Sequence, residues 1–469
     1  MNRNVPRLAT VLAVLLAVLV MAMPLTDSDL HLHLAMGRIF SLTGVPGQDA
    51  LSWTAAGTPW TPHEWLWSLA LWQVWQRTNS EGMWLLKLLL WMIPVLLALR
   101  ACPGERRDAV FLGSWSLALL AGAALWTLRP HVVMLIGLLA LVRSAGRQLT
   151  LRRAALTALG FALWANLHAS VLMGLGLWLL LRLPQWRCAG RRELAGLLLL
   201  ALATLANPAG ARLWLWPLSL LRDGKAGFVE EWGGFTAVAA TLPGIMFIAL
   251  TLLTLALVLQ AVRQRQALPW RELLLWLGFT VWALASRRMV APAALLAVLT
   301  VAMLPRRVRP ELVRARWLLA VACLAFLGWW QLPVRERFAV RRENLVVAVQ
   351  QLPSSAAMAV PRPGAAPLLV AGHLFHPYEW GGVLLFERWP ECRTFVDGRT
   401  EVFPSQLLAD YGILFRAGTG WRELLDRYEI DAAWLPAGAP LAAALAADRW
   451  QLELLPGGSL YLTRPNVEK

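Results

Sequence analysis

The chain has 469 residues, of which 58% are hydrophobic and only 15% are charged, and its mean hydropathy is +0.54. This composition is too apolar for a soluble globular protein and indicates a polytopic membrane protein. The net charge of +16 does not indicate a nucleic-acid partner, because the basic residues stand in short loops between apolar runs and form no patch interleaved with aromatic residues.

The first apolar run covers residues 8–23 and follows Arg3 and Arg7. Basic residues ahead of an apolar segment are typical of a signal anchor with a cytoplasmic N-terminus. They are also typical of a cleavable signal peptide, and Val20-Met21-Ala22 ends in a small residue as a cleavage site does. Because further apolar runs follow, we expect the uncleaved anchor.

Lys and Arg collect in short loops on the cytoplasmic side of a membrane. In this chain the basic loops cover residues 100–107, 143–153, 182–192, 263–271 and 306–316, and consecutive loops leave room for two spans. The pattern predicts about eleven transmembrane helices, over residues 8–25, 82–99, 109–128, 130–142, 154–166, 168–181, 194–207, 243–262, 272–286, 289–304 and 317–331. Several are shorter than the ~20 residues of a full crossing. The predicted pairing of the helices is therefore fixed only to within one hairpin.

The first outer loop, residues 26–81, is predicted to hold two short helices that lie along the membrane. One covers Leu30 to Leu42 and ends before Gly44, a common C-cap residue. The other begins at Thr61-Pro62-His63-Glu64, with Thr61 as N-cap and Glu64 completing a capping box. A membrane span over residues 64–77 is the alternative to the second surface helix.

From residue 333 onward, helical and strand-like pieces alternate, which predicts a small α/β domain. The pieces are 368–371, 378–388, 393–397, 421–428, 431–435, 441–447 and a hairpin of 450–455 with 459–463. We therefore expect a transmembrane domain over 1–332 and an extracytoplasmic α/β domain over 333–469. Phe395-Val396-Asp397-Gly398-Arg399 has the pattern of a strand that runs into a turn, for which a structural role is favoured over a catalytic one.

Two carboxylates, Asp27 and Asp29, stand where the first apolar run stops. Ionised groups near a bilayer are retained mainly for function or pairing, and a carboxylate at the mouth of a pocket can accept a proton from an attacking hydroxyl. The pair is therefore a candidate for a general base with its helper, or for a clamp on a divalent cation such as Mg²⁺ or Mn²⁺. The alternatives are an N-cap for the next helix, and a Zn²⁺ site that includes His31 and His33.

Three arginines are predicted at the outer ends of later helices, where topology alone does not place positive charge. Arg129, Arg287 and Arg288 carry guanidinium groups, whose planar fork matches phosphate. We expect them to contact a phosphate or pyrophosphate at the membrane surface. Lipid headgroups, or ion pairs with acidic residues of the same face, are the alternative partners.

Further polar residues belong to the same predicted outer face. A capping box is a sufficient explanation for Glu64. Asn166 and His168 flank a tight turn between short helices, and turn chemistry explains the next such turn, at Asn207-Pro208, almost completely. We nevertheless include Glu64 as a candidate catalytic residue. The candidate substrate-binding residues, besides the arginines, are His63, His131, Asn166, His168 and Glu231.

Several common site types are not indicated. The four cysteines, Cys102, Cys188, Cys323 and Cys392, share no CxxC spacing, so neither a zinc site nor a disulfide framework is supported. The sequence has no Walker motif, no dinucleotide-binding glycine pattern and no G-x-S-x-G motif. Without machinery for a nucleotide, an activated lipid is the favoured energy source.

Taken together, these features resemble the GT-C superfamily of integral-membrane glycosyltransferases. The resemblance comes from the Asp27-x-Asp29 pair after the first span, the long first outer loop, about eleven spans and the C-terminal domain. The chain is also similar to uncharacterised bacterial membrane proteins with a D-x-D-x-x-x-H-L-A-x-G opening, here Asp27 to Gly37, and H-E-W-L, here His63 to Leu66. The match is sharpest over residues 27–66.

The resemblance implies hexosyl or pentosyl transfer from a polyprenyl-phosphate-linked donor to an acceptor at the extracytoplasmic face of the bacterial inner membrane. It implies that Asp27 or Asp29 acts as base and that arginines lie near the donor phosphate. Only Glu230-Glu231 is a candidate for a second acidic motif. The competing hypotheses are a transporter or flippase for a lipid-linked or anionic solute, and a non-catalytic envelope assembly protein. The sugar, the acceptor and the oligomeric state are not specified.

Overall fold

The structure, a computed structural model, describes residues 4–22, 25, 28–215, 233–305, 373–455 and 458–465. Asp27, Glu231, the predicted helix over 317–331 and the predicted strand over 368–371 lie outside these residues. The chain forms two compact units. The helical unit consists of Met1–Leu25, Ser80–Asn207 and Val229–Arg335, and the mixed unit consists of Thr26–Asn79, Pro208–Phe228 and Glu336–Lys469.

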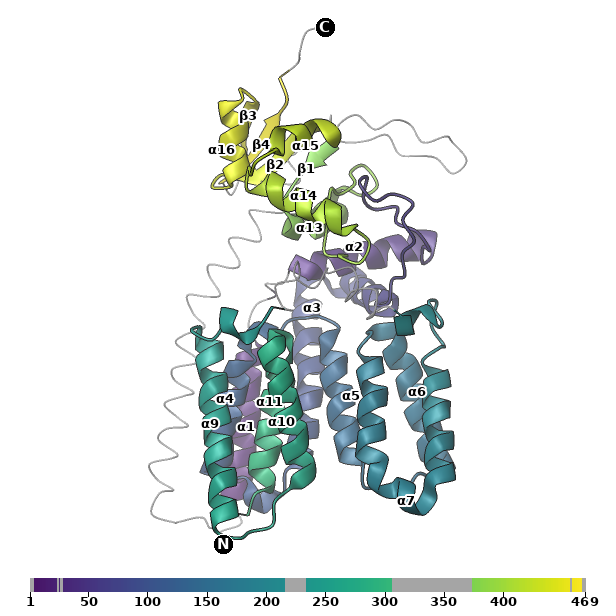
Figure 1. Cartoon of the computed structure of the whole chain (residues 1–469), viewed down its shortest axis with the longest axis vertical. Coiled ribbons are helices and arrows are strands. Elements are labelled where there is room, and N and C mark those ends of the chain that lie inside the picture. Colours follow the sequence, from purple (N-terminus) through teal and green to yellow (C-terminus); the bar gives the residue numbers. More distant parts are fainter. Residues whose placement is uncertain are drawn as a thin grey trace. The chain divides into compact units, whose positions relative to one another are not determined.

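The helical unit contains long apolar helices joined by short turns (Figure 1). They are α1 (Asn4–Met21), the part of α3 (Trp65–Ala101) after Asn79, α4 (Ala109–Ala121), α5 (His131–Ser144), α6 (Leu151–Leu167), α7 (Val171–Ala203), α9 (Leu242–Arg263), α10 (Trp270–Ala285) and α11 (Val290–Met303). Short 3₁₀ turns are η1 (Gly104–Arg106), η2 (Ala123–Leu125), η5 (Phe235–Ala237) and η6 (Arg287–Met289). The backbone leaves the helical conformation at Asn79 in α3 and at Ala189 in α7, so each contains two helices.

Each predicted helix that lies within the described residues coincides with an observed helix. Two of them, Trp65–Ala101 and Leu242–Arg263, are long and apolar enough to cross a membrane by length and composition. The structure therefore confirms a mainly helical protein with apolar helices, whereas the total of about eleven membrane spans stays a prediction.

Small residues allow close packing at the centre of the helical unit. α11 packs against α4, α9 and α10, and nearly all of its side chains are buried. A helix that is apolar on every side belongs inside a bundle, and its many alanines let neighbouring backbones approach. Trp164 of α6 fills a similar gap, because a Cβ on Gly137 or Gly174 would lie 2.2 or 2.7 Å from its ring.

The mixed unit contains a four-stranded sheet in the order β1-β2-β4-β3. β1 pairs parallel with β2, and the other two pairs are antiparallel. Its elements are α2 (Ser28–Thr43), the part of α3 before Asn79, β1 (His373–Phe375), η9 (Tyr378–Trp380), α13 (Gly381–Arg388), α14 (Ser405–Phe415), α15 (Trp421–Arg427), β2 (Ile430–Pro436), α16 (Pro440–Ala447), β3 (Gln451–Leu455) and β4 (Ser459–Thr463). The predicted small α/β region is confirmed. The boundary at residue 333 stays a prediction.

One predicted strand is wrong. Residues 393–397 form an irregular segment with a single bridge, between Thr394 and Ser52, and the strand beside β2 is β1. The reason is that the hydrogen-bonding groups of this segment are taken by a distant loop. Thr394 N–H donates to the Leu51 carbonyl at 3.0 Å, and Trp53 N–H donates to the Thr394 carbonyl at 3.1 Å.

The two predicted helices of the first outer loop are present, with changed starts. α2 begins at Ser28, two residues earlier than expected. The second helix begins at Trp65, so the predicted N-cap at Thr61 and the capping box with Glu64 are wrong. The direction of these helices relative to a membrane stays a prediction.

The loop and the C-terminal segment share one hydrophobic core. Leu32, Met36, Ile39 and Phe40 on α2 are buried in the same cluster as the apolar side chains of the sheet and its helices. Each such side chain contributes about 1.5–3 kcal/mol when it is fully buried. The segment that carries the acidic motif is therefore built into the C-terminal fold.

Candidate functional site

Asp29 lies in the first turn of α2, and it is half-buried. The N-terminal turn of a helix exposes backbone N–H groups and the positive end of the helix dipole, which favour a carboxylate. Because α2 begins at Ser28, Asp29 is inside the helix, and the N-cap alternative does not account for it. Asp27 lies outside the described residues.

Two glycines of the C-terminal segment bring backbone against this first part of α2. A Cβ on Gly382 of α13 would lie 2.8 Å from the backbone nitrogen of Leu32. A Cβ on Gly398 would lie 2.8 Å from Cδ2 of Leu32 and 3.5 Å from Oδ1 of Asp29. The segment around Gly398 therefore forms part of the immediate surroundings of the Asp29 carboxylate.

α2 also crosses α3 at close range. A Cβ on Gly37 would lie 2.1 Å from the Ser68 carbonyl oxygen and 2.6 Å from Cβ of Trp72, so only glycine allows this approach. Four residues earlier on α2, Nδ1 of the buried His33 hydrogen-bonds to Oγ of Ser68 at 2.9 Å. The H-L-A-x-G part of the motif thus has a packing role that fixes α2 on α3.

Glu64 lies between two imidazoles. Its Oε2 is 3.8 Å from Nε2 of His33, and its Oε1 is 3.6 Å from Nε2 of His63. Burial alone would lower the pKa of His63, but Glu64, with a smaller contribution from Glu401, outweighs burial and raises it. Because His33 follows Asp29 by four residues, both stand on one face of α2. The structure therefore joins the predicted Glu64 and His63 to His33, which was not among the predicted substrate-binding residues.

His31 belongs to a different environment. Its ring makes an edge contact with Phe386 of α13, with centroids 5.8 Å apart. His31 and His33 thus contact different helices. Within the described residues no group of three or more His, Cys, Asp or Glu side chains is arranged to hold a metal. The cation at Asp27 and Asp29 stays a prediction.

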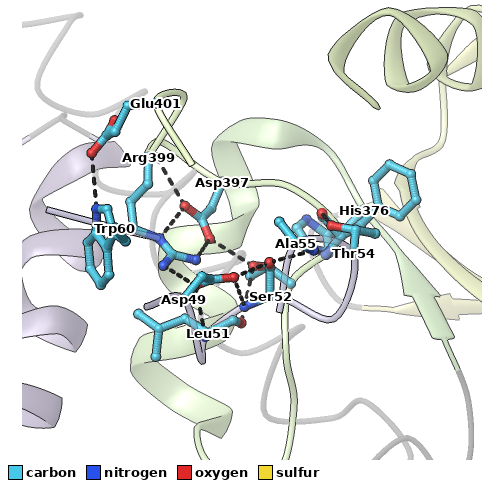
Figure 2. Close-up of polar contacts among 12 residues, drawn as sticks. Asp49, Leu51, Ser52, Thr54, Ala55, Trp60, His376, Asp397, Arg399 and Glu401 are labelled. Carbon is cyan, nitrogen blue, oxygen red and sulfur yellow. Dashed lines mark hydrogen bonds and ion pairs between the residues drawn. The ribbon is translucent and has the colours of Figure 1, made fainter. Parts of the chain in front are cut away.

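A buried ion cluster ties the outer loop to the C-terminal segment (Figure 2). Arg399 donates from Nε and Nη2 to the two carboxylate oxygens of Asp397, at 2.8 and 2.7 Å, and from Nη1 to Asp49. The side chains of all three are at most 2% exposed. The guanidinium also lies over the ring of Trp60, 4.7 Å from its centroid, an arrangement that favours a cation.

The remaining polar atoms of this cluster are also bonded. Asp397 accepts from Oγ1 of Thr394 at 2.7 Å, and Asp49 accepts from the backbone N–H groups of Leu51 and Ser52 at 3.0 and 3.2 Å. Burial alone would raise the pKa of Asp397, but the charge and hydrogen bonds of Arg399 outweigh it and hold the pKa below its usual value. The pair of Asp397 and Arg399 therefore stays ionised at neutral pH.

The polar candidates of the helical unit bond to other groups of that unit. Nε2 of His131 donates to the Leu125 carbonyl at 2.6 Å. The Asn166 amide donates to the carbonyls of Ala162 and Ala206, at 2.8 and 2.7 Å. Nδ1 of His168 bonds to Oγ of Ser170 at 2.6 Å. These contacts give all three a role in the structure of their helix ends.

The three arginines also belong to the helical unit. Arg129 precedes α5, Arg287 and Arg288 form the turn η6 between α10 and α11, and all three side chains are half-buried. The backbone N–H of Arg287 donates to the carbonyl of Gly233 at 3.0 Å. The sequence-based candidates thus divide between the units, with Asp29, His63 and Glu64 in the mixed unit.

No protein-family model and no curated protein matches the chain. Solved structures do match the chain, among them two from one archaeon. One is the archaeal oligosaccharyltransferase AglB from Archaeoglobus fulgidus in complex with an inhibitory peptide and a dolichol-phosphate, 12% identical, with a TM-score of 0.50 over 99% of this chain and 74% of that one. The other is the oligosaccharyltransferase of the same organism in its apo form, 12% identical, with a TM-score of 0.51 over 92% and 69%.

The chain shares its fold with these oligosaccharyltransferases. At 12% identity the likeness establishes the fold alone, and it agrees with the membrane glycosyltransferase fold that the resemblance implied. The placement in a bacterial branch and the dependence on a polyprenyl phosphate stay predictions.

Proposed function

We propose that this GT-C protein is a membrane glycosyltransferase that moves a sugar from a polyprenyl-phosphate-linked donor to an acceptor at the extracytoplasmic face of the bacterial inner membrane. The observation that carries the proposal is the position of Asp29, in the first turn of α2 and beside Gly398 of the C-terminal segment. The dolichol-phosphate bound to the archaeal neighbour supports a donor in which the sugar is linked to a lipid phosphate.

Asp29 acts as the general base in this proposal. The acceptor hydroxyl gives its proton to the Asp29 carboxylate while its oxygen forms a bond to the anomeric carbon of the sugar. The bond between that carbon and the phosphate oxygen breaks, and its electron pair leaves with the polyprenyl phosphate. The reaction inverts the anomeric configuration, because no enzyme carboxylate forms a bond to the sugar. Asp27 orients Asp29 or shares a divalent cation with it.

The arginines stabilise the charge that develops on the leaving phosphate. Arg129, Arg287 and Arg288 offer N–H groups that suit phosphate oxygens, and preorganised donors at a site of developing charge lower the barrier most effectively. The bonds of His131, Asn166 and His168 to other groups of the helical unit favour a supporting role for these three residues.

Glu64, His33 and His63 form a second group of polar side chains in the proposed substrate site. Glu64 is 22% exposed, and it lies between His33 and His63. A carboxylate in this position accepts hydrogen bonds from sugar or acceptor hydroxyls, and Glu64 raises the pKa of the neighbouring His63. We assign Glu64 and His63 to substrate binding. Both lie near His33, which is one helical turn from the proposed base Asp29 on α2.

The test is sugar transfer by the purified full-length protein in lipid nanodiscs. Polyprenyl phosphates that carry radiolabelled hexoses or pentoses serve as donors, and a membrane extract supplies acceptors. We expect Asp29→Asn to reduce transfer at least 100-fold. Asp426→Asn, which removes a carboxylate from the exposed pair with Arg464, should leave transfer unchanged. Transfer by Asp29→Asn within twofold of the parent protein would refute the assignment, and movement of the donor without transfer would favour a flippase.

A further inference from the structure

The segment that contains Gly398 is held unusually firmly. Burying charged groups is costly unless they are paired and hydrogen-bonded, and here the Arg399 guanidinium is bonded on three nitrogens. The backbone on the other side of Asp397 is held as well, because Oγ1 of Thr54 donates to the Phe395 carbonyl and Nε2 of His376 accepts from the Phe395 N–H at 3.1 Å. The segment therefore has a single backbone position.

Gly398 is the exception within this buried segment. Residues 394–397 and 399–400 are buried, whereas Gly398 between them is exposed. The two residues that flank it, Asp397 and Arg399, are the partners of the bidentate ion pair. The ion pair thus clamps the chain on both sides of one exposed peptide unit, and this unit faces Leu32 and Asp29 on α2.

We propose that Arg399, held by Asp49 and Asp397, is a positioning residue: it fixes the Gly398 backbone against the first turn of α2 and thereby sets the orientation of the Asp29 carboxylate. The proposal rests on the proposed function only for the role of Asp29 as base. The geometry itself can be tested without any enzymatic activity.

The neighbouring Tyr378 fits this arrangement. Its hydroxyl bonds to Oγ1 of Thr400 at 2.6 Å, two residues after Gly398. Burial, and then the negative charges of Asp29, Asp397 and Glu401, raise the pKa of Tyr378, so the phenol stays protonated. The segment after the ion pair therefore presents a neutral hydroxyl, which does not compete with Asp29 for a proton.

The first experiment measures disulfide formation in the full-length protein that carries Asp29→Cys, Gly398→Cys, Leu32→Ala to make room for the new Cβ and, to remove an exposed native thiol, Cys188→Ser. A mild oxidant should link positions 29 and 398 rapidly, because a Cβ at 398 comes within 3.5 Å of the residue 29 side chain. Adding Arg399→Lys, which keeps the charge but loses the fork, should slow the linkage at least tenfold. Peptide mass spectrometry identifies the linkage.

The matched control is Arg422→Lys, which alters the fork of an exposed pair with Asp448 in the same unit. It should leave the rate of linkage unchanged. An equal rate with Arg399→Lys, or no linkage between 29 and 398 in the parent protein, would overturn the proposal. If linkage behaves as expected while Asp29→Asn keeps its activity, the proposed function fails and the positioning geometry stands.

A second pair of variants tests the proposal even if Arg399→Lys does not fold. In Gly398→Ala the new methyl meets Cδ2 of Leu32 at 2.8 Å, which should push the first turn of α2 away. We expect kcat for transfer to fall about tenfold with KM unchanged. Adding Leu32→Ala removes the contacted atom and should restore kcat to within threefold. A lowered kcat that Leu32→Ala does not restore would contradict the proposal.

Discussion

The two units use their polar residues in different ways. In the helical unit His131 and His168 bond within a few residues of themselves, as His168 does to Ser170, and the packing depends on small apolar residues. In the mixed unit the bonds join residues far apart in the chain, such as Asp49 and Arg399. Precise orientation of a reacting group requires such over-determined surroundings, so we place the base in the mixed unit and the phosphate contacts in the helical unit.

The largest effect is expected from a substitution that breaks the ion cluster of Asp49, Asp397 and Arg399. Arg399→Met leaves two buried carboxylates without their partner, and such a loss costs about 3–5 kcal/mol. We expect the mixed unit to unfold, or its midpoint in urea to fall sharply. Limited proteolysis with peptide mapping shows which unit opens. Unchanged resistance of residues 373–465 would contradict the structural role of the cluster.

The arginines of the helical unit should behave in the opposite way. The double variant Arg287→Gln and Arg288→Gln should lower transfer by about 10²–10³-fold, the typical effect of removing preorganised charge stabilisation, with thermal stability unchanged. Arg152→Gln, an exposed arginine at the start of α6, is the control and should have no effect. Loss of stability without a specific loss of transfer would assign the pair to packing.

Acid should weaken the mixed unit through His376. Burial lowers the pKa of His376 from 6.5 to about 4, and its nearest charged partner is Asp397. Below pH 6.5 His376 binds a proton in the unfolded chain but not in the folded unit. Stability that is present above pH 6.5 is therefore lost as the pH falls toward 4. At about 1.4 kcal/mol per pKa unit the loss is about 3 kcal/mol.

The raised pKa of His63 acts in the opposite direction, because the folded form gains a proton there. Urea unfolding between pH 7 and 4, compared in the parent protein and in His376→Gln, separates the two contributions. The variant should lose less stability on acidification. An equal loss in both proteins would rule out His376 as the origin.

The smallest effects compare glycines of the two units. Gly37→Ala places a methyl 2.1 Å from the Ser68 carbonyl, and overpacking of this kind costs about 1–3 kcal/mol. A methyl at Gly278 in α10 would meet no atom within 4 Å, so Gly278→Ala should stabilise the protein by about 0.5–1 kcal/mol. Thermal melting in one detergent should show opposite shifts for the two variants.

Local patterns predicted much of the fold. Apolar runs located the helices of the helical unit, and alternating runs located β2, β3 and β4, because both signals lie within a few neighbouring residues. The failures share one cause. Residues 393–397 have a strand-like pattern, but their backbone bonds go to residues 51–53. Glu64 matched a capping box, but its carboxylate lies beside His33 and His63.

The candidate site was predictable only in part. The spacing from Asp29 to His33 and the H-E-W-L motif pointed to residues that the structure places in one unit. Asp49 gave no signal, because an isolated Asp in a loop resembles a turn residue, and its partner lies 350 residues further along the chain. The charges of Asp397 and Arg399 inside an apolar stretch were the available hint that a buried pair was present.

The mixed unit is assembled from the two ends of the chain, α2 from residues 28–43 and the sheet from residues 373–463. A ribosome delivers α2 long before it delivers the strands that cover Leu32 and the glycine that faces Asp29. During synthesis the apolar face of α2 remains exposed until the C-terminal segment has been made, since contacts between distant segments form slowly. A product that ends before residue 373 therefore contains α2 and the described helices of the helical unit, but it lacks the segment around Gly398 that surrounds the Asp29 carboxylate.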